Sequence, residues 1–160
     1  MALSGDEVRK DEELLDIDLL ATRKKRFRIN GDSNRILELN TSDMNVVSRL
    51  NKIYPKLHKL NTKAINIKFD NEGNEEQQLE QVATQLEEID TEMRSLLDEL
   101  FDTNVSEVAA PDGSMYDPFL GKFRYEHIIE ALLKLYDENF TSEFEMMRKR
   151  VETKTSKYIK

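Results

Sequence analysis

The feature that most constrains this chain is one long amphipathic stretch, residues 75–101. Its apolar residues are spaced alternately by three and four positions, as on one face of an α-helix: Leu79, Val82, Leu86, Ile89, Met93, Leu96 and Leu100. The stretch contains neither Gly nor Pro and is rich in residues that favour helix. At about 1.5 Å per residue such a helix spans about 40 Å. We therefore expect a helical protein organised around this segment.

Two packing arrangements suit this helix, a coiled coil with a second copy or one wall of a globular core. With Leu79 at heptad position a, Ala83 and Leu97 fall at position e, so the apolar face is wider than a two-stranded seam. No basic residue occupies an e or g position between residues 79 and 100, so parallel self-pairing brings no opposite charges together. The pattern favours a globular core, with Leu86, Ile89 and Met93 buried by the two flanking helices.

Composition excludes several functional classes. The 160-residue chain has a net charge of −8, which argues against a protein that wraps nucleic acid or lies on an anionic membrane. It has no cysteine, which excludes disulfides and thiolate metal sites. No apolar run approaches the ~18 residues of a membrane span, and acidic residues interrupt the N-terminus where a signal peptide would be apolar. We expect a cytoplasmic protein that binds neither nucleic acid nor membrane.

The remaining chain predicts a small hairpin and two further helices. Residues 1–18 are expected to be an acidic, flexible segment, and a short helical turn or docking strip is expected at its end, formed by Leu14, Leu15, Ile17, Leu19 and Leu20. Residues 19–160 are expected to form one domain. Alternating residues on both sides of the turn at 31–34 predict a β-hairpin. The predicted fold class is mainly α with a small β-hairpin (α+β), with helices packed around the long central helix.

The two further helices flank the central one in sequence. The first follows the capping residues 40–43 and carries an apolar stripe to residue 60, in which Pro55 is expected to kink or split the helix near Tyr54. A short strand is possible at residues 65–69, and the central helix is expected to end near Asn104. The last helix starts at residues 123–125 and runs to about residue 155. Its apolar face comprises Ile128, Leu132, Leu135, Tyr136, Phe140, Phe144, Met147 and Val151.

No catalytic signature is present. The chain lacks G-x-S-x-G, Walker, dinucleotide and H-E-x-x-H motifs, and its two histidines, His58 and His127, have no second ligand or nucleophile at suitable spacing. We therefore expect no catalytic residue, no metal site and no cofactor. Two binding classes remain, an assembly factor that recruits other proteins and an acidic inhibitor that imitates nucleic acid. The basic runs at 23–28 and 148–160 argue against the inhibitor, which requires a surface of one sign.

The segment from Met115 to Phe123 is rich in aromatic residues, is punctuated by Pro and Gly, and fits no helical or strand period. An exposed patch of this kind marks a partner site, and Met115, Tyr116 and Phe119 are its candidate partner-binding residues. The alternative is a loop that inserts Phe119 and Phe123 into the core.

The order of these parts resembles the tail assembly chaperones of long-tailed phages that infect Gram-positive bacteria. The matching parts are the hairpin KRFRINGDSNRILELN (25–40), the capped helix TSDMNVVSRLNKIYPKL (41–57), a mid-chain helix ending at Leu100-Phe101 before Asn104-Val105-Ser106, the helix FRYEHIIEALLKLYDENF (123–140) and the Lys-rich end KTSKY (154–158). The likeness covers residues 20–160. Family members often have Phe-Gly where this chain has Phe101-Asp102.

The resemblance implies a non-catalytic chaperone in the bacterial host cytoplasm. Such a protein coats the tape measure protein, recruits tail tube subunits and is absent from the finished virion. The alternative within phage biology is a structural head or tail component. Self-association is also expected, because the basic end 148–160 of one copy can meet the acidic region 70–102 of the next. The competing interpretation is that these two regions pair within one molecule.

Overall fold

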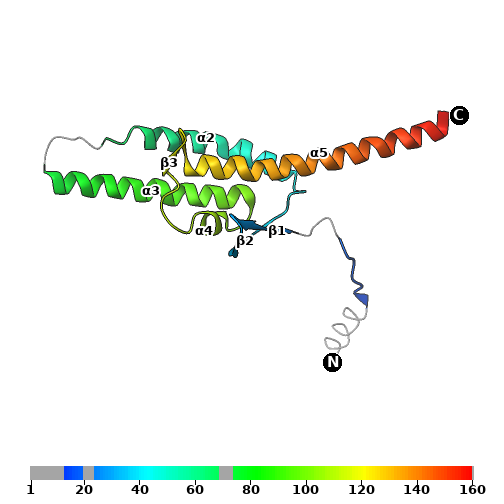
Figure 1. Ribbon diagram of the computed structural model, residues 1–160, viewed down its shortest axis with the longest axis horizontal. Helices are drawn as coiled ribbons and strands as arrows, with labels where there is room; N and C mark the ends of the chain where they lie inside the picture. Colours follow the sequence, from blue (N-terminus) through cyan, green and yellow to red (C-terminus); the bar gives the residue numbers. More distant parts are fainter. Residues whose placement is uncertain (1–12, 20–23, 69–73, 160) are drawn as a thin grey trace, which may run out of the picture.

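The computed structural model describes residues 13–19, 24–68 and 74–159, with side chains as far as residue 153. Figure 1 shows the long helices extending along the long axis, with a β-hairpin and a short helix at one side. The fold is mainly α with a small hairpin, as the sequence predicts. The elements are β1 (Lys25–Ile29), β2 (Asp32–Leu39), α2 (Asn45–Ile65), α3 (Glu75–Phe101), α4 (Val105–Ala109), β3 (Pro118–Phe119), β4 (Lys122–Phe123) and α5 (Arg124–Ile159).

The predicted hairpin is confirmed, but its turn lies at Asn30–Gly31 and not at the predicted residues 31–34, because β2 already begins at Asp32. Strands β1 and β2 are antiparallel, with Phe27 opposite Leu37. Asn30 and Gly31 both have positive φ, 52° and 72°, which is the conformation that Asn-Gly favours in a tight hairpin turn. Leu37 and Leu39 are fully buried, so β2 anchors the hairpin to the helices.

Helix α2 is continuous from Asn45 to Ile65, so of the two predicted alternatives near Tyr54, a kink or a split, the split is wrong. Pro55 lies inside the helix, where it removes one backbone donor. The buried residues Ile53, Leu57 and Leu60 continue on one face past the proline, and their packing outweighs this local cost. The predicted strand at 65–69 is also wrong where it is described, because Ile65 belongs to α2 and residues 66–68 form no strand. Phe69 lies outside the described residues.

The central helix α3 packs as one wall of a core, and its buried face is broadly the predicted one. Ile89, Met93 and Leu100 are buried, and Leu86 and Leu96 are partly buried. Two residues depart from the prediction. Leu79 was counted in the apolar face but is 72% exposed, and Leu97 was placed at the edge of that face but is fully buried.

Helix α3 ends earlier than predicted. Its last residue is Phe101, and Asp102 takes the left-handed conformation with φ 52° and ψ 43°. The Asp102 N–H donates to the carbonyl of Asp98. Asn104, the predicted cap, has φ −78° instead. Asp102 therefore has a backbone conformation that favours glycine.

The first part of helix α5 packs in the core, and its second part extends out of the core. Tyr136 is 2% exposed, and its ring centroid lies 6.0 Å from that of Phe101 on α3. From residue 141 to residue 153 every residue is exposed. Figure 1 shows this part of α5 extending well beyond the rest of the molecule. We call residues 140–153 the arm.

The predicted N-terminal segment 1–18 lies mostly outside the described residues. Its described part, Glu13 onward, is exposed through Leu19 and lies away from the helices in Figure 1. In the parts of the chain that the structure describes, no helix combines the length and apolar character needed to cross a membrane.

Candidate partner-binding surface

Two residues one turn apart on α3, Asp90 and Arg94, position the segment that carries the predicted partner residues. Asp90 accepts hydrogen bonds from the Met115 N–H at 2.7 Å and from Arg94 Nε at 2.9 Å. Arg94 also donates to three carbonyl groups of the segment after α3. Its acceptors are the carbonyls of Ser106 at 3.2 Å, Ala110 at 2.8 Å and Gly113 at 2.9 Å.

Asp98, one turn further along α3, completes this polar row. Its carboxylate accepts hydrogen bonds from the Ser106 N–H at 2.8 Å and from the Ser106 hydroxyl at 2.9 Å. Residues four apart on a helix share one face. Asp90, Arg94 and Asp98 therefore form a single strip that binds the segment from α4 to Met115 against α3.

This strip draws Met115 and Tyr116 into the core. Met115 is fully buried and Tyr116 is 5% exposed. The ring of Tyr116 packs edge-on against Phe123 at 5.2 Å and Tyr125 at 5.4 Å. Met115 and Tyr116 therefore offer no accessible surface, and the prediction that they form an exposed patch is wrong. The alternative prediction is met only in part, because Phe123 is half-buried while Phe119 is not in the core.

Burial also sets the ionisation of these tyrosines. Loss of solvent raises the pKa of the Tyr116 phenol and of the Tyr125 phenol well above the usual value near 10. Tyr125 donates to Asn61 Oδ1 at 2.6 Å. The Tyr116 hydroxyl is buried and has no hydrogen-bond partner in the described part of the chain. Both phenols stay neutral near pH 7, as core residues do.

Phe119 lies at the tip of a second, very short hairpin formed by β3 and β4. Its side chain is 66% exposed, and that of Leu120 beside it is 78% exposed. Leu120 and Gly121 turn the chain with φ values of 52° and 76°. His127 on α5 holds the tip, because its Nε2 lies 2.7 Å from the Phe119 carbonyl oxygen. Of the three predicted partner residues, Phe119 alone is accessible, and its role in binding stays a prediction.

The arm of α5 carries a stripe of accessible apolar side chains. Phe144, Met147 and Val151 follow Phe140 at steps of four, three and four residues, and are 39%, 47% and 57% exposed. Such steps put them on one helical face. The rings of Phe140 and Phe144 stack at 6.2 Å, and Phe140 meets Tyr136 at 6.1 Å. The stripe is therefore a direct continuation of the core onto an exposed helix. Sequence periodicity predicted this face, but not that its second half extends beyond the core.

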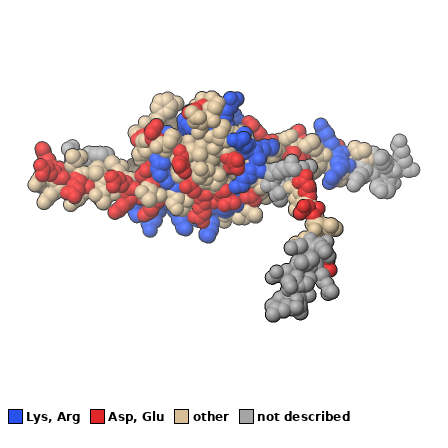
Figure 2. Space-filling view, turned by 90° about the horizontal axis from the view of Figure 1, so that it is seen from below, with Lys and Arg blue, Asp and Glu red and all other residues tan. Residues whose placement is uncertain are grey.

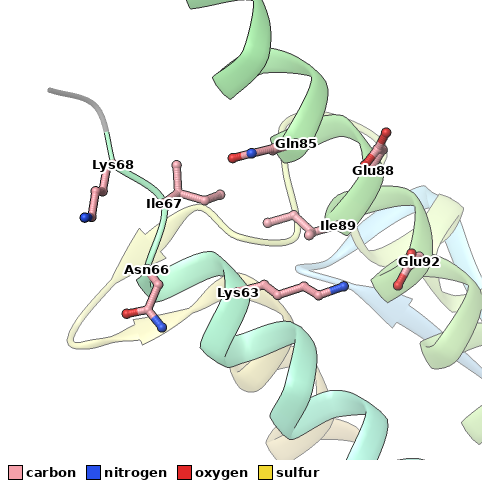
Figure 3. A pocket seen from close by; sticks show the side chains of 8 residues that line it. All are labelled: Lys63, Asn66, Ile67, Lys68, Gln85, Glu88, Ile89 and Glu92. Atoms are coloured by element: carbon pink, nitrogen blue, oxygen red, sulfur yellow. The ribbon is translucent and has the colours of Figure 1, made fainter. Parts of the chain in front are cut away.

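An open pocket of about 500 Å³ lies where the end of α2 meets the middle of α3, and Figure 3 shows the side chains that line it. Ile67 and Ile89 face each other across it, while Lys63 extends along its lower side. The other lining side chains include Glu88 and Glu92. Charges of both signs around a small apolar floor select no single class of ligand. Among the described residues, no group of three His, Cys, Asp or Glu is arranged to hold a metal ion.

No protein-family model matches this chain, and no curated protein and no solved structure matches it either.

Proposed function

We propose that this protein is a non-catalytic assembly chaperone of a phage tail, and that its arm binds the helical tape measure protein in the cytoplasm of the bacterial host. The observation that carries the proposal is the apolar stripe of the arm. An amphipathic helix with an accessible apolar face binds other helices through anchors at i, i+3, i+4 and i+7. Phe140, Phe144 and Met147 have this spacing.

The arm suits a long helical partner for two further reasons. It is a helix outside the body, so a partner helix can lie along it without meeting the other elements (Figure 1). Its surface also mixes Glu143 and Glu145 with Arg148, Lys149 and Arg150, so both signs of charge flank the stripe. The exposed tip at Phe119 supplies a separate contact for tail tube subunits.

The alternative of an acidic inhibitor is less well supported. A nucleic-acid mimic requires a surface of one sign, like the phosphate backbone that it replaces. Figure 2 shows Lys and Arg side chains among the Asp and Glu side chains on the face in view, with basic groups gathered near its middle and on the arm.

Co-expression with the tape measure protein encoded in the same gene cluster tests the proposal. The variant carries Phe144→Ser and Met147→Ser, which remove two central anchors of the stripe. We expect at least a tenfold loss of captured tape measure protein, because burying each such side chain contributes roughly 1.5–3 kcal/mol. The matched control is Lys149→Ser, on the opposite face of the same helix.

Two outcomes would refute the proposal. One is failure of the wild-type protein to capture the tape measure protein at all. The other is equal capture by the stripe variant and by the Lys149→Ser control. Because Phe144 and Met147 lie outside the core, the melting temperature of the stripe variant should stay close to that of the wild-type protein, which separates lost binding from lost folding.

A further inference from the structure

A groove of about 540 Å³ lies between the β1–β2 hairpin and the first half of α5. Its floor is apolar and includes Phe27 and Ile29 from β1 and Leu135 from α5. Its rim is basic and includes Arg28 and Arg124. None of the residues that line it is acidic, although the chain carries a net charge of −8.

Within the described part of the chain, no carboxylate forms an ion pair with Arg28, Arg35 or Arg124. Arg35 donates to the backbone carbonyls of Val108 and Ala109, and Arg124 to the carbonyl of Asp112. These acceptors carry no net charge, so both guanidinium groups remain positive at the rim. The guanidinium of Arg28 makes no hydrogen bond or ion pair within the described part of the chain. The groove therefore suits a segment that is both apolar and acidic.

The chain itself contains such a segment just before β1. Leu14, Leu15 and Ile17 are 74%, 88% and 80% exposed, which leaves three large aliphatic side chains in water. Glu13 and Asp16 accompany them, and no basic residue occurs between residues 11 and 22. Covering these side chains with an apolar floor contributes favourable free energy roughly in proportion to the area removed from water.

We propose that residues 13–19 of one copy bind in this groove on a second copy. The exposure of Leu14, Leu15 and Ile17 excludes them from the groove of their own chain in this structure, and Figure 1 shows the segment directed away from the body. The contact joins two different surfaces, so each copy offers a segment to one neighbour and a groove to another. Contacts of this kind build rings or open spirals. This interface is separate from the arm and goes beyond the proposed function.

Disulfide trapping tests which surfaces meet, and the absence of native cysteine makes it specific. One single variant carries Ile17→Cys, and the other carries Ala131→Cys, an exposed position on α5 that lines the groove. In a mixture of the two variants, the mixed disulfide dimer should form in greater yield than the disulfide homodimer that either variant forms on its own. Absence of the mixed dimer would overturn the proposal. An intramolecular disulfide in the double variant, without linkage between chains, would show docking within one copy and overturn it as well.

Sedimentation velocity over a range of protein concentrations tests the energetics. The wild-type protein should associate as concentration rises. Ile17→Asp should weaken association about tenfold or more, because it places a charge where the apolar floor requires an aliphatic side chain. Arg28→Glu should also weaken it, and adding Asp16→Arg to that variant should restore part of the loss.

Arg26→Glu is the matched control for Arg28→Glu. It makes the same change in net charge two positions away on the same strand, but Arg26 does not line the groove. A wild-type protein that is monomeric at every concentration would refute the interface. Equal weakening by Arg26→Glu and Arg28→Glu would also refute it, because net charge rather than the groove would then govern association.

Discussion

Arg94 is the side chain whose removal should be most informative about how this fold is held together. It is only 24% exposed, and it makes four hydrogen bonds, to the Asp90 carboxylate and to three backbone carbonyls between α4 and Met115. Arg94→Met keeps an unbranched side chain of similar helix propensity but removes all five N–H donors. It leaves three carbonyl groups and one carboxylate oxygen short of a partner.

The expected cost follows from these contacts. Hydrogen bonds that involve a charged group contribute about 1.5–3 kcal/mol each when they are buried. Partial access of water reduces each of the four to about 1 kcal/mol, so Arg94→Met should lower the free energy of unfolding by about 3–4 kcal/mol. Arg94→Lys should lose about half as much, because an ammonium group keeps the charge but cannot reach carbonyls in several directions at once.

Urea unfolding followed by circular dichroism measures this change. Lys134→Met is the control: Lys134 is 75% exposed and makes only a 3.9 Å contact with Glu138, so it should stay within about 0.5 kcal/mol of the wild-type protein. In a domain of this size each kcal/mol shifts the melting temperature by roughly 2–4 °C, which predicts a loss of about 6–16 °C for Arg94→Met. If both variants fall within about 1 kcal/mol of the wild-type protein, Arg94 does not hold the segment after α3.

Further predictions concern single side chains. Tyr116→Phe should leave the free energy of unfolding unchanged or raise it, because the Tyr116 hydroxyl is buried without a partner in the described part of the chain. Tyr125→Phe should lower the free energy of unfolding by about 1 kcal/mol, because it removes the hydrogen bond to Asn61. Urea titrations that rank the two variants the other way would contradict this. Burial raises the pKa of both phenols above the value of about 10 that applies in the unfolded chain, so their contribution to the free energy of unfolding is complete below about pH 10. Unfolding titrations should show this free energy falling as the pH rises above that value. A free energy of unfolding that stays constant from pH 8 to pH 11 would argue against buried phenols. Leu97→Ala should cost about 2–5 kcal/mol and Glu87→Ala less than about 0.5 kcal/mol in the same assay, and similar losses would mean that the buried face of α3 is misassigned. Asp102→Gly should raise the melting temperature, because glycine adopts the left-handed conformation at this position without the strain of a side chain, a gain of up to about 1 kcal/mol in the free energy of unfolding. A lower melting temperature would refute that account.

Local periodicity was enough to predict most of the helices and the main hairpin. The three- and four-residue steps of α3 and the alternation on both sides of residues 31–34 each specify an element with little help from the rest of the chain, although the turn itself lies at Asn30–Gly31. The predicted split of α2 at Pro55 rested on a single missing backbone donor and did not weigh the buried residues on both sides of the proline. Leu79 was counted in the core on spacing alone, although it lies beyond the part of α3 that other elements cover.

The accessible surface was harder to predict than the elements, because it depends on contacts between residues far apart in the sequence. Asp90, Arg94 and Asp98 have the spacing of an ordinary solvated helix face, and nothing local indicates that they bind the segment 106–115. That contact is what buries Met115 and leaves Phe119 outside. A row of polar residues at i, i+4 and i+8 with alternating charge, Asp-Arg-Asp, was the available signal.

The continuity of α5 has a consequence for the direction in which the arm presents its stripe. One uninterrupted helix connects Tyr136 in the core to Phe144 on the arm, so the number of residues between them sets the angular phase of the stripe relative to the body. A helix turns about 100° and rises about 1.5 Å per residue. One residue inserted after Phe140 would rotate the stripe by about 100° and aim it at a different side. Seven inserted residues would return the stripe to within about 20° of its original direction while moving it about 10 Å further from the core. The number of residues in α5 therefore sets both the direction of the stripe and its distance from the core, and insertions of different length change the two separately.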